Sequence, residues 1–159
     1  MARFLLGTQT FVDLACLVAG KPRVWLAKVY QTRGVMDLDL AISALSLVQI
    51  EQAFKKKEAQ GPLDAEMIAR RHRCRAYAQE FRNRNSILAF GDSEVAAWSL
   101  IASLPLLYID SKGVSSQIGD GEIFVVATAL ATRLTLLDHL QPAHTALGIL
   151  GLLVEDPYV

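Results

Sequence analysis

The feature that most constrains the fold of this chain is the alternation of short apolar runs with longer, helix-like segments. Apolar runs of strand length lie at residues 2–6, 39–43, 86–90, 134–138 and 151–156. Segments with helical periodicity or helix end signals lie at residues 10–18, 21–30, 45–57, 64–82, 92–104, 122–133 and 142–150. Residues 110–120 are expected to form a loop. This alternation predicts an α/β fold with a mostly parallel sheet covered by helices on both faces.

The length of 159 residues suits one continuous core, so we expect a single domain over residues 1–159. The hydrophobic fraction of 52% and the mean hydropathy of +0.30 raise the question of a membrane segment. The longest uncharged stretch, Val95–Ile109, is shorter than the roughly 18 residues of a spanning helix and contains Pro105. We therefore expect a buried helix followed by a strand there, and no membrane partner. Near the N-terminus, residues 7–10 and Asp13 interrupt the apolar core that a signal peptide needs.

Cysteine and histidine show no spacing typical of metal sites. Cys16 and Cys74 lie far apart in the sequence, and we interpret both as reduced thiols of a cytoplasmic protein. His72, His139 and His144 are not paired with cysteines or carboxylates at a zinc-binding spacing, so we expect them on the surface or in loops.

The formal net charge is zero, but the charges are unevenly distributed. Residues 55–84 contain nine Lys or Arg and four Asp or Glu, a net charge of +5, so the rest of the chain carries −5. Arg70, Arg71, Arg73 and Arg75 lie in the predicted helix 64–82, and such side chains neutralise the phosphates of nucleic acids. They are candidate RNA-binding residues. A solvated basic face on a core helix is the favoured alternative, and self-association through this face also remains open.

In parallel sheets of this kind, ligands bind beyond the carboxyl ends of the strands. The expected strand ends carry Gly7 and Thr8, Ser43, and Asp138. The segment Gly7-Thr8-Gln9 offers no charge, no strong nucleophile and no good metal ligand. The first strand thus ends where chemistry is expected, but without the residue types that chemistry needs.

Five segments of the sequence resemble the motifs of PIN domains, in the family's order and over nearly the whole chain. They read FLLGTQTFVDLA, VWLAKVYQTRGVMDLDLAISALSLVQIEQ, SILAFGDSEVAAW, IGDGEIFVVATALATRLTLLDH and LLVEDPY. The resemblance is to the bacterial toxin branch, of the VapC and FitB kind. It implies a three-layer α/β/α PIN-like fold, a homodimer, a small antitoxin protein as partner, and cleavage of RNA with Mg²⁺ or Mn²⁺.

The metal chemistry of this family rests on acidic side chains that the chain has mostly lost. Mg²⁺ prefers oxygen ligands and lowers the pKa of a bound water, which then attacks the phosphate. Matched to the family's motifs, Gly7 and Gln49 replace an Asp and a Glu, while Thr8 is kept. Leu140 falls on the last acidic position in a gapless alignment, and Asp138 lies two residues earlier. The sequence therefore predicts a degenerate site.

Few acids remain as candidates for chemistry. Glu122 replaces the Asp of the fourth motif, so Glu122 and Asp138 are the tentative catalytic residues. Glu122 and Asp120 are the candidate metal ligands, although Asp120 is also expected to cap the helix that begins beside it. Glu51 is two residues from Gln49 and is expected to point elsewhere, and Asp13 is expected a turn and a half along its own helix.

Three functions remain open. The first is a degenerate ribonuclease of the toxin–antitoxin type that keeps partner or nucleic-acid binding with weak or no cleavage. The second is an active endoribonuclease toxin, dependent on Mg²⁺ or Mn²⁺, with a divergent acidic site. The third is an unrelated α/β protein that binds a small ligand, which a flavodoxin-like strand order with a pocket near Gly7 would favour. The absence of a Gly-rich phosphate loop counts against that third function.

Overall fold

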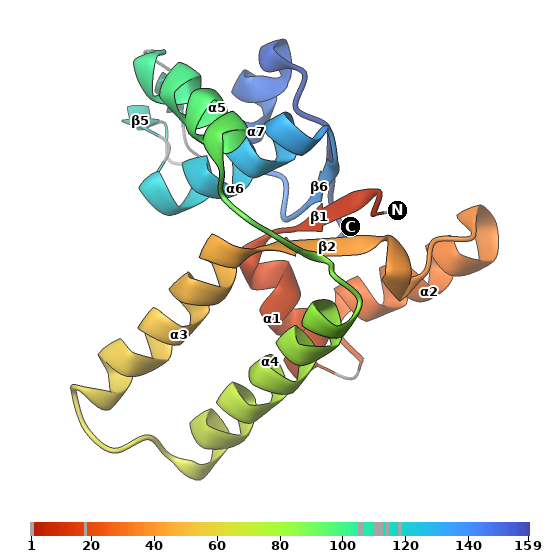
Figure 1. Cartoon of the computed structure of the whole chain (residues 1–159), viewed down its shortest axis with the longest axis vertical. Coiled ribbons are helices and arrows are strands. Elements are labelled where there is room, and N and C mark those ends of the chain that lie inside the picture. Colours follow the sequence, from red (N-terminus) through yellow and green to blue (C-terminus); the bar gives the residue numbers. More distant parts are fainter. Residues whose placement is uncertain (1, 18, 105–106, 110–112, 114, 118) are drawn as a thin grey trace.

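In the computed structural model of the protein, five parallel strands form a central sheet (Figure 1). The structure describes residues 2–17, 19–104, 107–109, 113, 115–117 and 119–159. The strands are β1 (Phe4–Leu6), β2 (Leu40–Ser43), β3 (Ile87–Leu88), β6 (Thr135–Leu137) and β7 (Val154–Glu155), in the spatial order β3-β2-β1-β6-β7. The predicted parallel sheet is confirmed, and its strand order is not the flavodoxin-like one.

Helices cover both faces of the sheet and give three layers (Figure 1). One face packs in an apolar cluster with α1 (Thr8–Cys16), α2 (Lys21–Arg33), α3 (Ala44–Glu58) and α4 (Ala65–Asn83). The other face packs with α5 (Asp92–Ser103), α6 (Asp120–Thr132) and α7 (Pro142–Leu147). Short 3₁₀ helices, η1 (Asp37–Asp39) and η2 (Gly148–Leu150), precede β2 and β7. The predicted α/β/α layering is therefore confirmed.

Strand β1 contributes to both cores because successive side chains of a strand point to opposite faces. Phe4 and Leu6 lie in the cluster with α1–α4, whereas Leu5 lies in the cluster with α5–α7. A strand buried on both sides carries a continuous apolar run rather than an alternating one, which explains the sequence Phe-Leu-Leu. The residues that follow β1 are consequently fixed in position by a strand at the centre of the molecule.

Several element ends differ from the predictions. Helix α1 begins at Thr8, two residues earlier than expected, so Thr8 and Gln9 form its first turn and Gly7 is its N-cap. Gly91, rather than Asp92 or Ser93, is the N-cap of α5, and its backbone N–H donates to the Glu94 carboxylate at 2.9 Å. The N-cap of α6 is Gly119, so the expectation that Asp120 caps this helix is wrong. In each case the chain becomes helical at or just before the polar residue, and a glycine holds the extended cap conformation.

The predicted loop 110–120 is wrong at its centre. Strand β5 (Ser115–Gln117) pairs with β4 (Leu107–Ile109) in a separate antiparallel sheet. Gly113 between them has φ = 77°, the left-handed conformation that glycine adopts without strain in a turn. Residues 110–112, 114 and 118 of the expected loop lie outside the described residues.

The apolar stretch Val95–Ile109 is divided between α5 and β4, as the sequence predicts, with residues 105 and 106 outside the described part. Ile101 of α5 is buried against the second face of the sheet. Within the residues that the structure describes, no helix combines the length and apolar character needed to cross a membrane.

Candidate functional site

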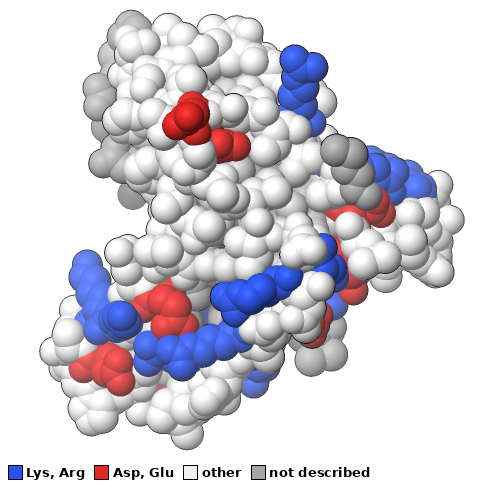
Figure 2. Space-filling view, in the orientation of Figure 1, with Lys and Arg blue, Asp and Glu red and all other residues white. Residues whose placement is uncertain are grey.

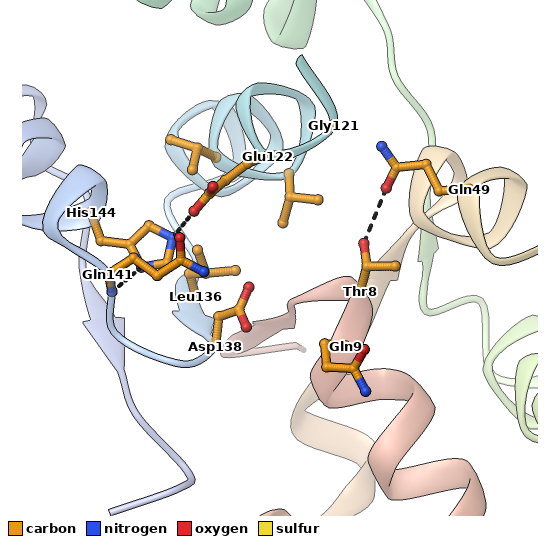
Figure 3. A pocket seen from close by; sticks show the side chains of 11 residues that line it. Thr8, Gln9, Gln49, Gly121, Glu122, Leu136, Asp138, Gln141 and His144 are labelled. Atoms are coloured by element: carbon orange, nitrogen blue, oxygen red, sulfur yellow. Dashed lines mark hydrogen bonds and ion pairs between the residues drawn. The ribbon is translucent and has the colours of Figure 1, made fainter. Parts of the chain in front are cut away.

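A hollow of about 250 Å³ lies at the carboxyl ends of β1 and β6 (Figure 3). The order of the sheet reverses between these two strands, and such a switch point leaves a crevice where ligands bind in α/β folds. The hollow is lined by residues of α1, α3, α6, β6 and α7 and of the loop between β6 and α7, namely Thr8, Gln9, Gln49, Gly121, Glu122, Val125, Val126, Leu136, Asp138, Gln141 and His144. The hollow therefore lies at the carboxyl ends of the strands, where the sequence predicts the candidate site.

Gly7 and Asp138 follow the paired residues Leu6 and Leu137, and they lie in contact. The Gly7 N–H donates to the Leu137 carbonyl at 2.8 Å. A Cβ added to Gly7 would lie within 3 Å of the Asp138 Cβ, Cγ and Oδ2. Real Cβ atoms do not approach other atoms this closely. The Asp138 side chain thus occupies the space that any side chain at position 7 would need.

The wall formed by Thr8, Gln9 and Gln49 is here called the neutral wall, and Figure 3 shows the hydrogen bond between Thr8 and Gln49. The Thr8 hydroxyl lies 3.2 Å from Gln49 Oε1, to which it donates, and 3.1 Å from Ser46 Oγ. Gln9 Nε2 donates to Asp13 at 2.8 Å, one turn further along α1. The Gln49 amide packs against Gly121, where an added Cβ would lie 2.7 Å from Nε2. The three side chains of this wall carry no charge, and two of them, Thr8 and Gln9, donate hydrogen bonds to neighbouring side chains.

The opposite wall, here called the charged wall, consists of Glu122, Asp138 and His144. Glu122 Oε1 lies 2.7 Å from His144 Nε2, although the contact lacks hydrogen-bond geometry. His144 Nδ1 accepts from the Gln141 N–H at 3.3 Å, so the neutral imidazole carries its proton on Nε2, facing Glu122. The His144 side chain is fully buried, whereas that of Glu122 is 24% exposed. Glu122 therefore reaches the hollow with one oxygen directed at an imidazole.

Asp138 is the most perturbed acid of the hollow. Burial raises the pKa of its carboxyl above the usual value, and the nearby Glu122 carboxylate adds to that effect. The His139 backbone N–H, 2.8 Å from Oδ1, and the His144 imidazole oppose it. A carboxyl with a raised pKa holds its proton more readily. Ionisation of Asp138 therefore lowers the stability of the folded protein.

The donor set of the hollow does not fit the divalent ion that the resemblance implies. Mg²⁺ takes oxygen ligands in near-octahedral geometry and is usually held by carboxylates. Among the described residues, no three His, Cys, Asp or Glu side chains lie close enough to share one metal ion. Gln49 Oε1 already accepts from Thr8, and Glu122 already contacts His144. In the described part of the chain, the remaining carboxyl groups of the hollow are that of half-buried Asp138 and that of Glu122, which contacts His144.

The other acids named from the sequence lie elsewhere. Asp13 is buried and accepts from the Tyr158 hydroxyl at 2.6 Å, which holds the C-terminal segment against α1. Glu51 faces α4 rather than the hollow. Leu140 is exposed in the loop after β6, and its N–H donates to Asp156 at 2.9 Å. Asp120 is the first residue of α6, and its side chain lies outside the described part of the chain.

The predicted basic face of α4 is partly neutralised. Arg75 contacts both oxygens of Glu51, at 2.8 and 2.9 Å, and Arg71 donates to the same carboxylate at 3.0 Å and to Glu58 at 3.4 Å. These contacts lower the pKa of Glu51 to about 2, chiefly through Arg75. Figure 2 shows acidic and basic side chains interleaved over the α3–α4 pair. Two of the four candidate RNA-binding arginines therefore join α3 to α4.

A second hollow of about 250 Å³ adjoins the first, and Thr8, Gln9 and Gln49 line both. Its other lining residues come from α1, α3 and α4, namely Val12, Ile50, Ala53, Phe54, Lys57, Met67 and Arg70. Apolar side chains make most of this lining, and Lys57 and Arg70 are its two cationic residues. The neutral wall therefore separates an acidic hollow from an apolar one with a basic edge.

The expectation that all histidines have surface or loop roles is wrong for His144. It lies on the buried side of α7 together with Ala143 and Leu147, and its ring faces Glu122. The sequence does contain a signal for this burial. Positions 143, 144 and 147 lie on one face of a helix that begins at Pro142, which is the spacing of a buried helical face. Gln141 was not named as a site residue either, although its backbone orients the imidazole.

No protein-family model matches the sequence, and no curated protein matches it. The structure is similar to a chain of VapBC2 from Rickettsia felis bound to a DNA fragment from their promoter, with 16% identity and a TM-score of 0.60 over 96% of this chain and 97% of that one. It is similar to FitAcB from Neisseria gonorrhoeae, with 17% identity and a TM-score of 0.64 over 98% of both chains. VapBC-1 from nontypeable Haemophilus influenzae gives 14% identity and a TM-score of 0.62, also over 98% of both. These likenesses, at low identity, show that the chain has a PIN-like fold.

Proposed function

We propose that this chain is a degenerate ribonuclease of the toxin–antitoxin type. In this proposal residues 1–159 form one domain, which acts as a cytoplasmic homodimer and binds a small antitoxin protein and RNA while cleaving RNA weakly or not at all. The observation that carries the proposal is the neutral wall. Where the resembling family has carboxylates, Gly7 and Gln49 bring no charge, and the Asp138 side chain occupies the space beside Gly7.

The loss of charge bears directly on catalysis. A divalent ion that gives up its hydration water reluctantly needs several anionic ligands to hold it near a phosphate. Among the described residues, Glu122 and Asp138 are the carboxylates that line the hollow, and the pKa of Asp138 is raised by burial. The attraction for Mg²⁺ or Mn²⁺ is therefore expected to be weak, and cleavage that needs such an ion weak with it.

The alternative is an active endoribonuclease with a divergent site, and one observation favours it. Glu122 and Asp138 both line the hollow although they come from different elements, as catalytic acids do. The test is to incubate the purified chain with structured RNAs in the presence of Mg²⁺ or Mn²⁺, next to Glu122→Ala and Asp138→Asn. We expect no metal-dependent cleavage above the background of the variants. Cleavage that needs the metal and is lost in Glu122→Ala would establish the alternative.

The second hollow supports the partner part of the proposal. Its apolar floor suits apolar side chains of a protein segment, and Lys57 and Arg70 suit an acidic residue of that segment. The check is to co-express the chain with the small reading frame next to its own and to measure co-purification. Lys57→Glu combined with Arg70→Glu should weaken the complex at least tenfold. Lys28→Glu, on the exposed surface of α2, is the control and should leave the complex intact.

A further inference from the structure

Two thiols from distant parts of the sequence meet between α1 and α4. Cys16 is the last residue of α1, and Cys74 lies near the middle of α4. Their Sγ atoms are 3.7 Å apart although the residues are separated by 58 positions. The chain has two cysteines, so each is the other's sole possible partner within one molecule.

We propose that Cys16 and Cys74 form a site of reversible oxidation that joins α1 to α4 through a disulfide. The sulfur atoms of a disulfide are about 2.0 Å apart, so the two thiols must approach each other by less than 2 Å. Rotation of side chains already in contact supplies movements of this size. In the structure both thiols are free, and in a reducing compartment disulfides that do form are typically transient or redox-sensing.

The two thiols differ in access, and this difference assigns their roles. Cys16 is half-buried, whereas Cys74 is 2% exposed. Burial raises the pKa of the Cys74 thiol to about 12, the neighbouring Cys16 adds to that effect, and Arg70 and Arg73 oppose it. An oxidant from solvent therefore reaches Cys16 first, and Cys74 acts as the resolving thiol.

A hydroperoxide is the chemical class of oxidant that fits this arrangement. The Cys16 thiolate attacks one oxygen of hydrogen peroxide, the O–O bond breaks, and a sulfenic acid and water form once a proton is taken up. The Cys74 sulfur then attacks the Cys16 sulfur, the S–S bond forms, and the S–O bond breaks with release of a second water. Two thiols lose two electrons in total, peroxide gains them, and the two thiol protons end in the two waters. A dithiol reductant reverses the reaction by thiol–disulfide exchange.

The position of this bond gives it a structural consequence. The N-terminal turn of α1 carries Thr8 and Gln9, and the facing part of α4 carries Met67 and Arg70. All four side chains line the second hollow. A covalent link between α1 and α4 therefore fixes two of the three helices that surround that hollow. This consequence follows from the geometry alone and does not depend on the proposed function.

The test is to treat the reduced, folded full-length chain with a slight excess of hydrogen peroxide and then to count thiols after denaturation. We expect the count to fall from two to zero, and a digest to contain one peptide pair linked through Cys16 and Cys74. The melting temperature should rise by roughly 5 to 15 °C, because the crosslink restricts the unfolded chain. Hydrogen exchange in α1 should slow, and dithiothreitol should reverse every change.

Two single-cysteine variants serve as controls for the peroxide experiment, and the digest of the natural chain provides an independent check. Cys16→Ser and Cys74→Ala each retain one thiol, so neither should form the linked peptide or gain melting temperature under peroxide. If Cys74→Ala does not fold, the digest of the natural chain still decides the matter. The proposal is overturned if both thiols survive peroxide, if Cys16 is oxidised to a sulfinic acid without a linked peptide, or if the disulfide forms only between two molecules.

Discussion

The neutral and charged walls lie on opposite sides of the hollow, at the carboxyl ends of β1 and β6. The polar side chains of the two walls differ in their hydrogen bonds. On the neutral wall, Thr8 and Gln9 direct their hydrogen bonds at neighbouring side chains. On the charged wall, Glu122 Oε1 has no well-formed hydrogen bond, and the half-buried Asp138 carboxyl has a raised pKa. The neutral wall therefore carries no charged side chain, whereas the charged wall carries the carboxyl groups of Glu122 and Asp138.

If the chain is a degenerate ribonuclease, as we propose, this difference shows how the fold holds uncharged residues in place of acidic ones. Removing a charge leaves polar neighbours that need new hydrogen bonds, because buried unpaired polar groups are costly. Gln49 fits this requirement, since its carbonyl oxygen accepts from Thr8 and its amide packs on Gly121. At the end of β1 no side chain replaces the missing acid. The Asp138 side chain fills the space beside Gly7 instead.

The largest expected effect comes from placing an acid at the end of β1. In Gly7→Asp the new Cβ would lie inside the space of Asp138, and two carboxylates would compete for one position. We expect a loss of about 3 kcal/mol in the free energy of unfolding. Chemical denaturation at neutral pH measures it.

Two further variants test whether Asp138 causes that loss. Gly7→Asp combined with Asp138→Gly removes the clash and should recover more than half of the stability, a coupling of over about 1 kcal/mol. Gly119→Asp is the matched control, because Gly119 is also an N-cap with extended backbone, and no described atom lies within 4 Å of its Cβ position. It should change stability by a few tenths of a kcal/mol. Equal losses in Gly7→Asp with and without Asp138 would refute the space-filling explanation.

The next effect comes from charging the neutral wall. Gln49→Glu removes the amide donor and places a third carboxylate near Glu122 and Asp138, so we expect a loss of about 1 to 2 kcal/mol at neutral pH. Millimolar Mn²⁺ should raise the melting temperature of this variant more than that of the natural chain. Gln52→Glu, exposed on the same helix, is the control and should change neither quantity appreciably. If Mn²⁺ gave no larger gain in this variant, the proposal that an uncharged residue at position 49 weakens metal binding would be contradicted.

The sequence predicted some of the residues that meet at the hollow, but not how they contact one another. Gly7, Thr8 and Asp138 were expected together because parallel strands bring their carboxyl ends to one edge of the sheet. The contact between Asp138 and the Gly7 backbone depends on the register of β1 and β6, and a single sequence does not specify that register. The same limit explains β5, since Ser-Ser-Gln has no strand signal and pairs only because β4 lies beside it.

His144 could not be assigned to the site for a different reason. A single histidine in a six-residue helix has no paired ligand spacing, and its burial depends on α7 packing against the sheet. Arg71 and Arg75 illustrate another limit of the sequence. Their sequence pattern is that of a basic surface, yet Glu51, the carboxylate that pairs with both, lies on α3, 20 and 24 positions away.

A smaller effect tests whether Glu51 belongs to the α3–α4 contact and not to the hollow. The pKa of Glu51 is lowered to about 2, so its stabilising contribution is present above the ordinary value of 4.5 and is lost as the pH falls toward 2. Glu51→Gln should lose about 0.5 to 1 kcal/mol at neutral pH, since solvent screens this partly exposed pair, and nothing near pH 2. Glu58→Gln, with a single longer contact to Arg71, should lose less.

The smallest expected effect has the opposite sign and belongs to the charged wall. Because the folded-state pKa of Asp138 is raised, stability falls as the pH rises from its ordinary value of 3.8 through the raised one, and the deficit persists at neutral pH. Asp138→Asn keeps an oxygen that accepts from the His139 N–H but carries no charge, so it should melt slightly higher than the natural chain at neutral pH. The gain should disappear below pH 3.8, where the natural carboxyl is protonated in both states. A loss of stability at neutral pH would instead mean that the ionised carboxylate is stabilised where it lies. The two walls would then differ in charge but not in electrostatic cost.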